Sequence, residues 1–196
     1  MGRVGVCERC TDETAIRVRI ALDEPGGIAS QTGVPFFDHM LTAMAFHGAF
    51  GIEVQAQGDL EVDAHHLVED VGICLGRAFA EALGEAERIE RFGQASIPMD
   101  ESLVTAVVDL SGRPFLRYDL AVPERPFGAF HTDLLLEFFR AVTINAGMTL
   151  HLRLEAGGNA HHVSEAAFKA LGRALRSAVA LSGAEGIPST KGRLRE

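Results

Sequence analysis

Cysteine is scarce in this sequence, with three residues in a chain of 196. Three cysteines do not make a disulfide framework. Cys7 and Cys10 have C-x-x-C spacing, but the chain has no second such pair, which argues against a zinc site. Cys74 lies on the apolar face of an expected helix and is interpreted as a small core residue.

Long apolar runs and an excess of positive charge are also missing. No run approaches the roughly 20 apolar residues that span a bilayer, and no signal-peptide pattern opens the chain, so we expect a cytoplasmic protein. The net charge of −9 argues against nucleic acid or an anionic membrane as the main partner. A small anionic substrate remains possible, because a local group of Arg and Lys could bind it.

Histidine, in contrast, occurs in a repeated pattern. His65-His66-Leu67-Val68-Glu69 is echoed by His161-His162-Val163-Ser164-Glu165. Each segment is expected to open a helix, because Asp63 and Asn159 are residue types that cap helix N-termini.

The spacing within each segment predicts metal binding. His65 and Glu69 are four residues apart, so they share one helix face and can bind one cation, while His66 points roughly 100° away and should serve another. The same holds for His161, Glu165 and His162. A single His-His pair is more often a surface or core feature, but its repetition favours a two-metal constellation.

The whole chain shows a tandem duplication of one α+β unit, about residues 1–92 and 93–184, with residues 185–196 as a tail. In the first unit we expect strands at 14–22 and 28–32 (a return strand), a helix at 35–50, strands at 51–57 and 60–62, and a helix at 65–83. After a polar join at 88–94, we expect strands at 103–110 and 115–120, a helix at 132–146, a strand at 148–154 and the second His-His helix. Each half should form an antiparallel sheet with helices packed on one face, within one compact domain.

Aligning the halves from their His-His pairs, with a two-residue loop difference, places His39 opposite Glu137. Each half thus supplies a further ligand candidate from its other helix. Glu13 and Glu101 occupy matched places at strand starts.

Five motifs together resemble the imidazoleglycerol-phosphate dehydratase family over nearly the whole chain. They are Pro35-Phe36-Phe37-Asp38-His39-Met40-Leu41, Asp63-Ala64-His65-His66-Leu67-Val68-Glu69-Asp70, Asp109-Leu110-Ser111-Gly112-Arg113-Pro114, Asn159-Ala160-His161-His162-Val163-Ser164-Glu165 and Pro188-Ser189-Thr190-Lys191-Gly192. The resemblance implies dehydration of imidazole glycerol phosphate to imidazole acetol phosphate, a step of histidine biosynthesis. It also implies two manganese ions per active site, ligands from adjacent subunits, and trimers that assemble into a cage of 24 chains.

The residue chemistry agrees with these implications. Imidazole and carboxylate ligands suit manganese, although zinc or iron could also occupy such sites. A plausible route has each metal bind one imidazole nitrogen of the substrate and stabilise an imidazolate, so that hydroxide leaves through a diazafulvene-like intermediate and the enol becomes a ketone.

The resemblance also assigns site residues. The expected metal ligands are His39, His65, His66, Glu69, Glu137, His161, His162 and Glu165. We expect one metal to take His39, His65, Glu69 and a neighbour's His162, and the other to take Glu137, His161, Glu165 and a neighbour's His66. The expected substrate contacts are Glu13, His39, His47, Arg91, Arg113, Ser189, Thr190 and Lys191, and the expected catalytic residues are Glu13, Glu69, Glu165 and His39.

Proton transfer is expected from Glu13 and Glu69, whose roles the sequence does not separate. Thr190 stands where serine is frequent in the family, and Glu137 where many members have histidine. His131 and His151 match no family ligand and are interpreted as structural or surface residues.

Two other functions also use clustered metal ligands. A dinuclear metallohydrolase is one, but the glutamates follow the histidines at the wrong offset for the H-E-x-x-H pattern of zinc proteases. A non-catalytic metal-binding cage protein is the other, and such a scaffold has no need of Arg91, Arg113 and Lys191 together.

Overall fold

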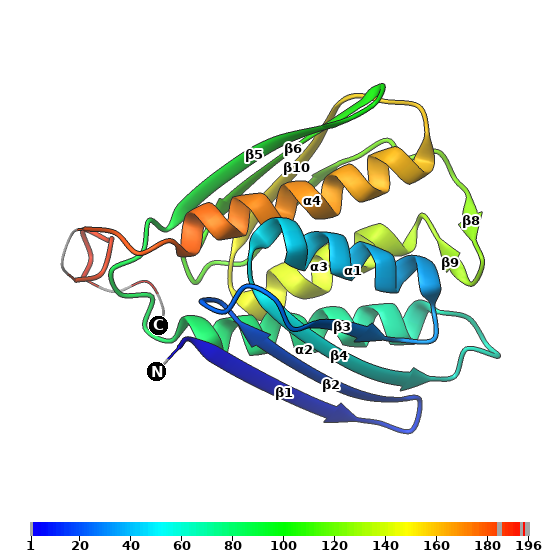
Figure 1. The fold of residues 1–196 in the computed structure, drawn as a ribbon, viewed down its shortest axis with the longest axis horizontal. Helices are drawn as coiled ribbons and strands as arrows, with labels where there is room; N and C mark the ends of the chain where they lie inside the picture. Colours follow the sequence, from blue (N-terminus) through cyan, green and yellow to red (C-terminus); the bar gives the residue numbers. More distant parts are fainter. Residues whose placement is uncertain (1, 184–185, 193, 195–196) are drawn as a thin grey trace.

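The computed structural model describes residues 2–183, 186–192 and 194 of the chain. Two four-stranded sheets form its outer layers, and four helices lie between them (Figure 1). The first half consists of β1 Val4–Cys10, β2 Thr14–Ala21, β3 Ile28–Gln31, α1 Pro35–Gly48, β4 Gly51–Gly58 and α2 His65–Leu83. The second half consists of β5 Phe92–Met99, β6 Ser102–Asp109, β7 Phe115–Asp119, the hairpin β8 Pro126–Phe127 and β9 Phe130–His131, α3 Leu134–Ala146, β10 Thr149–Ala156 and α4 Ala160–Val179.

The two large sheets have the same topology. Their strand orders are β1-β2-β4-β3 and β5-β6-β10-β7, which correspond strand for strand. This arrangement confirms the predicted α+β class and is consistent with a duplicated half-domain. Each sheet is antiparallel except for one pair, because β3 runs parallel to β4 and β7 runs parallel to β10. The stretch 28–32 therefore contains a strand, but this strand pairs with β4 and does not return along β2.

Helices pack across the two halves. In the first half α2 covers the inner face of its sheet, and α4 does the same in the second, while α1 packs on α4 and α3 packs on α2. Glycines permit this close approach, since a Cβ at Gly172 would lie 2.2 Å from the Met44 carbonyl oxygen and one at Gly76 would lie 2.8 Å from that of Val142. Each half therefore contributes one helix to the other half's packing.

One hydrophobic core joins the halves. The ring of Phe138 on α3 lies 5.3 Å from Phe37 on α1 and 5.0 Å from Phe168 on α4, measured between centroids. All three side chains are fully buried. Contacts of this kind make the duplicated halves one packed unit.

Most predicted elements are present, and the differences concern edges and turns. β1 was not expected, because its apolar Val6 faces solvent while the small Gly5 and Cys7 face α2. Residues 60–62 form a turn and not a strand, and Val62 is exposed. β5 begins at Phe92, inside the expected join 88–94, and the β8–β9 hairpin was not foreseen. None of the helices in the described ranges has the length and apolar character needed to cross a membrane.

Candidate metal centre

The first residues of α2 and α4 are held by polar side chains at the preceding loop. Asn159 is the N-cap of α4, and its side-chain oxygen accepts from the backbone N–H of His161 (2.9 Å) and His162 (3.4 Å). Asp63 lies one residue before the N-cap of α2 and accepts from His65 N–H at 2.7 Å. Asn159 thus caps α4 as predicted, whereas the N-cap position of α2 is Ala64, and Asp63, one residue earlier, binds only the backbone N–H of His65.

Three potential ligands meet between α1 and α4. The Nε2 atoms of His39 and His161 lie 3.2 Å and 3.1 Å from Glu165 Oε2, and the candidate ligand atoms all lie within 4.8 Å of one another. Glu165 is buried, whereas His39 is exposed. We call this set the α1–α4 cluster.

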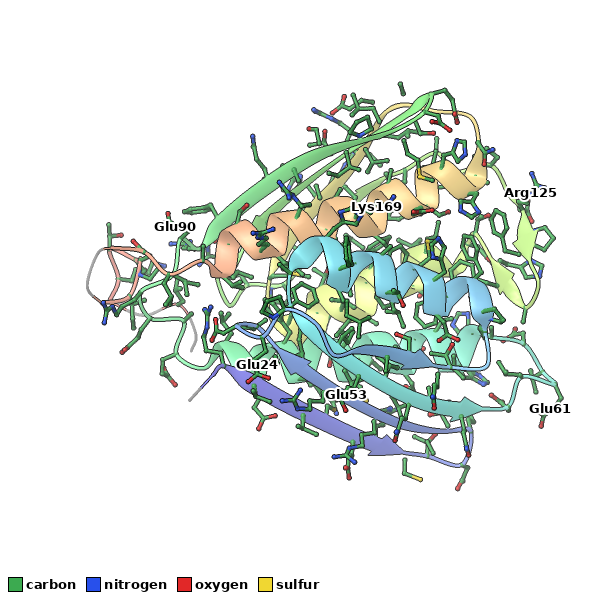
Figure 2. The ribbon with its side chains drawn as sticks, viewed as in Figure 1. Glu24, Glu53, Glu61, Glu90, Arg125 and Lys169 are labelled. Carbon is green, nitrogen blue, oxygen red and sulfur yellow. The ribbon has the colours of Figure 1, made fainter. Side chains whose placement is uncertain are left out.

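Lys169 lies one helical turn after Glu165 on α4 and contacts the α1–α4 cluster through that residue (Figure 2). Its Nζ lies 2.6 Å from Glu165 Oε1. Burial acts to raise the pKa of Glu165, but hydrogen bonds from Lys169 and His39 outweigh it and lower that pKa to about 2. The carboxylate is therefore ionised at neutral pH, as a metal ligand must be. Sequence reasoning missed Lys169, although its i,i+4 spacing from Glu165 was a usable signal.

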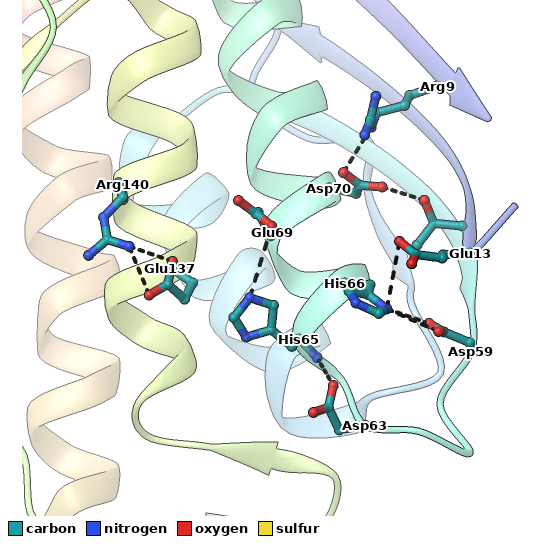
Figure 3. A network of polar contacts seen from close by, with 11 residues as sticks. Arg9, Glu13, Asp59, Asp63, His65, His66, Glu69, Asp70, Glu137 and Arg140 are labelled. Carbon is teal, nitrogen blue, oxygen red and sulfur yellow. Dashed lines mark hydrogen bonds and ion pairs between the residues drawn. The ribbon is translucent and has the colours of Figure 1, made fainter. Parts of the chain in front are cut away.

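The corresponding residues of the other helix pair are less closely associated. His65 Nε2 lies 4.0 Å from Glu69 Oε2 on α2, and Glu137 on α3 forms an ion pair with Arg140 at 2.7 Å (Figure 3). We call His65, Glu69 and Glu137 the α2–α3 group. Glycine contacts support the alignment of His39 with Glu137, because Gly172 meets Met44 and Gly76 meets Val142, five residues after His39 and Glu137 respectively.

The expected partition of ligands is wrong within the chain. His39 was grouped with His65 and Glu69, but the structure places it against His161 and Glu165. The reason is that helices from different halves pack together, since α1 packs on α4 and α3 packs on α2. The sequence alignment found the equivalent residues but could not show which helix each one faces.

The second histidine of each pair points away from the first. The rings of His65 and His66 are inclined by 84°, and those of His161 and His162 by 85°. His66 Nδ1 lies 3.0 Å from Asp59 and 3.8 Å from Glu13, and the hydrogen bond with Asp59 raises the pKa of His66.

His162 has a similar acidic environment. Its Nδ1 lies 2.9 Å from Glu101, and its Nε2 lies 3.8 Å from Asp100. The hydrogen bond with His162 is the largest cause that lowers the pKa of Glu101 to about 2. The prediction that His66 and His162 leave the faces of their neighbours is confirmed, while Asp59 and Asp100 were missed.

The expected phosphate contacts gather at the opposite end of the molecule. Arg91 Nε donates to Asp109 at 2.7 Å and its Nη1 to the Pro188 carbonyl at 2.9 Å, and Arg113 lies 3.7 Å from Asp109. Arg91 also has a φ of 69°, which is uncommon for a non-glycine residue.

A hollow of about 560 Å³ brings Arg113 and Lys191 together, with the C-terminal end of α3 as one wall. Ser189 accepts from the Lys191 backbone N–H at 3.2 Å, and Thr190 is exposed. We call Arg91, Arg113, Ser189, Thr190 and Lys191 the tail-end group.

The remaining predicted residues lie apart from these sets. His47, near the end of α1, has a pKa lowered first by burial and then by Lys169 and Arg173. His131 and His151 are exposed.

The two cysteines of the C-x-x-C motif do not converge. Cys10 is exposed, whereas Cys7 is half-buried and lies against Cys74. Burial, followed by the hydrogen bond with Cys7, raises the pKa of Cys74 to about 12. Cys74 is buried in the core, as expected.

Residues 32–175 match the family model described as imidazoleglycerol-phosphate dehydratase. The imidazoleglycerol-phosphate dehydratase of Moorella thermoacetica is 54% identical over 193 residues, covering 98% of each chain, and that of Lacticaseibacillus casei is 52% identical over 191 residues, covering 97% of this chain and 98% of the other. The crystal structure of the Staphylococcus aureus enzyme has a TM-score of 0.83 at 40% identity and covers 91% of this chain and 99% of that one. The Pyrococcus furiosus enzyme in complex with (S)-C348 has the same TM-score and identity, covering 96% and 100%.

Proposed function

The chain belongs to the imidazoleglycerol-phosphate dehydratase family, and we propose that it performs this dehydration with two manganese ions in each active site. The substrate would be imidazole glycerol phosphate, the product imidazole acetol phosphate, and the pathway histidine biosynthesis. The observation that carries the metal proposal is the α1–α4 cluster, where two imidazoles and a buried carboxylate converge from both halves.

The side chains of the α1–α4 cluster fit a divalent cation. Two imidazole nitrogens and a carboxylate oxygen lie within 4.8 Å of one another, and the carboxylate has a pKa of about 2. This donor set suits manganese, with zinc and iron as competing ions. The α2–α3 group offers two carboxylates and one imidazole, a harder set that favours manganese or magnesium, provided that Glu137 turns from Arg140 toward the ion.

Each ion needs more ligands than one chain brings to it. His66 and His162 project away from their own clusters and remain partly exposed, so they are available to a neighbouring copy. We infer that a neighbour's His66 or His162 completes each cluster. The ion would then be shared by two chains, which connects metal binding to assembly.

The position of the tail-end group supports sites shared between subunits. Arg91 N–H donates to the Ala178 carbonyl near the end of α4, whereas Glu165 lies 13 residues earlier (178 − 165). An α-helix of that length spans about 20 Å, which is too far for one small substrate to touch both groups. We therefore infer that a second copy supplies one of them. Trimers that assemble into a 24-chain particle would provide such interfaces.

The proposed chemistry removes a proton from an unactivated carbon, which is separated from the imidazole ring by the carbon that carries the leaving hydroxyl. The ions, which the α1–α4 cluster and the α2–α3 group would hold, would supply the positive charge that stabilises negative charge developing on the imidazole ring. Glu13 and Glu69 carry exposed or partly exposed carboxylates that can accept and return the proton. The hydroxyl on the carbon attached to the ring leaves as water after taking up a proton, loss of the proton from the next carbon gives the enol, and the enol tautomerises to the ketone.

Substrate binding would use the charged groups at the other end. Arg91, Arg113 and Lys191, with the hydroxyls of Ser189 and Thr190, are the donors that a phosphate requires. His47, whose lowered pKa keeps the ring neutral, would meet the substrate without adding charge.

The direct test is ketone formation from imidazole glycerol phosphate by metal-stripped protein, before and after addition of manganese, zinc or iron. We expect turnover only after metal addition and the highest rate with manganese. Full activity in demonstrably metal-free protein would contradict the metal proposal. Absence of turnover with every metal would favour a non-catalytic cage protein.

A further inference from the structure

The duplicated halves present two equivalent glutamates to two equivalent histidines. Glu13, in the β1–β2 turn, has its Oε2 3.8 Å from His66 Nδ1, and Glu101, in the β5–β6 turn, has its Oε2 2.9 Å from His162 Nδ1. The two turns differ in how firmly they hold these carboxylates. This difference distinguishes two otherwise matched residues.

Glu101 is fully engaged by its own half. Its Oε1 accepts a hydrogen bond from Ser102 Oγ at 2.9 Å and another from the Asn159 backbone N–H at 3.0 Å, while Oε2 meets His162. The carboxylate therefore ties the β5–β6 turn to the start of α4. A group held by three partners is poorly placed to exchange a proton with a substrate.

In the first half, the hydroxyl of the residue after the glutamate binds another side chain, so it does not engage the Glu13 carboxylate. Thr14 corresponds to Ser102, but its Oγ1 donates to Asp70 Oδ2 at 2.5 Å and not to the preceding glutamate. Asp70 is 5% exposed, and its Oδ1 accepts from Arg9 Nε at 2.8 Å (Figure 3). The only hydrogen bond or ion pair of the Glu13 side chain in the described part of the chain is the longer one with His66.

The second half lacks the residues that capture this hydroxyl. The positions equivalent to Asp70 and Arg9 are occupied by Ala166 and Ile97, as the matched helices and strands show. The strand register is fixed by close contacts, because Gly5 meets the Ala78 carbonyl and Gly93 meets that of Ala174. The Arg9–Asp70–Thr14 chain is thus a feature of the first half alone.

We propose that Asp70 is a positioning residue, which draws the Thr14 hydroxyl away from Glu13 and so keeps the Glu13 carboxylate free for proton transfer. The inference rests on the proposed dehydratase function and assigns Glu13, not Glu101, as the proton-transferring member of the pair. His66 and Asp70 are four residues apart on α2 and face the same turn, so Asp70 also fixes Glu13 beside His66.

The test transplants the second half's residues into the first. In the double variant Arg9→Ile/Asp70→Ala, the Thr14 hydroxyl should turn to Glu13, as Ser102 does to Glu101. We expect kcat to fall on the order of ten- to a hundredfold, with KM and manganese content unchanged. Adding Thr14→Val removes the competing hydroxyl and should restore most of kcat, which a purely structural role of Asp70 would not allow.

Two further variants sharpen the test. Asp70→Asn keeps an acceptor for Thr14 and should stay within a few-fold of wild-type kcat, and it remains informative if the double variant folds poorly. Arg3→Ile/Asp23→Ala removes an ion pair of 2.6 Å at the other end of β1 and serves as the matched control, with no expected change in kcat.

A crystal structure of the double variant tests the inference independently of turnover. The account predicts Thr14 Oγ1 within hydrogen-bond distance of Glu13. A Thr14 hydroxyl that stays away from Glu13, or a loss of kcat that Thr14→Val does not restore, would overturn the positioning role. A wild-type protein without turnover would instead contradict the proposed function, and the position of the hydroxyl would still decide this inference.

Discussion

His39 Nε2 lies 3.2 Å from Glu165 Oε2, although 126 positions and the boundary between the two halves separate these residues. The contact follows from the packing of α1 on α4, which the close approach of Gly172 to Met44 permits. The α1–α4 cluster therefore draws on both halves of the duplication. A half-chain expressed alone would lack one of its ligands.

The α2–α3 group leads to a prediction for Glu137. Glu137→Ala should lose most activity together with one of the two metals, because the remaining His65 and Glu69 would be an incomplete ligand set. Glu137→His should keep both metals, since imidazole can replace the carboxylate. The measurement is metal stoichiometry per chain alongside turnover.

The matched control for Glu137 is its ion-pair partner. Arg140→Gln removes the present partner of Glu137, at 2.7 Å, but leaves the proposed ligand in place, so metal content should stay at two. Retention of two metals and full activity by Glu137→Ala would show that Glu137 is not a ligand.

Metal and assembly should be linked if each ion is shared by two chains. Chelation should then reduce the particle size in size-exclusion chromatography, and manganese should restore it. An unchanged particle that stays active after demonstrated metal removal would refute the link.

The tail should contribute to substrate binding. Deleting residues 187–196 removes the Pro188 carbonyl that accepts from Arg91, together with Ser189, Thr190 and Lys191. We expect a raised KM or loss of turnover with the metal content unchanged, and a lowered thermal transition because the deletion also removes the buried Leu194. Wild-type kcat/KM in the truncated protein would exclude the tail from the site.

The pKa of Glu165 predicts how stability depends on pH in the metal-free protein. Its folded-state value of about 2 lies below the ordinary 4.5, so the ionised group contributes stability above pH 4.5 that is lost as the pH falls toward 2. Glu165→Gln should remove this contribution, which is on the order of 3 kcal/mol from the size of the shift. Unfolding free energies of the two proteins should diverge above pH 4.5 and converge near pH 2, and parallel curves across this range would contradict the prediction.

The sequence predicted the elements that repeat and carry strong periodicity. The helix at 65–83 has the predicted bounds, and Asn159 caps the second His-His helix as expected. These features depend on local chemistry, namely apolar spacing and capping, which a sequence displays directly. The alignment of His39 with Glu137 also holds in the packing of their helices.

Other features depend on contacts between distant segments. The sequence does not show that α1 crosses to α4, so the grouping of His39 with His65 was wrong. The roles of Lys169 and Asp70 follow from their contacts in the folded chain. Lys169 contacts Glu165, and Asp70 contacts Thr14. The edge strand β1 was missed because its inward residues are small.

Subunit complementation tests the shared active site most directly. Glu13 lies at the end of the molecule that carries His66, and Arg91 lies at the other end, near the end of α4. Glu13→Gln and Arg91→Ala should each be nearly inactive alone, yet particles reassembled from a mixture should regain dehydratase turnover, because some sites then combine wild-type Glu13 from one copy with wild-type Arg91 from another. Mixed particles, confirmed by mass spectrometry, that show no more turnover than the separate variants would contradict an active site built from two copies of this chain.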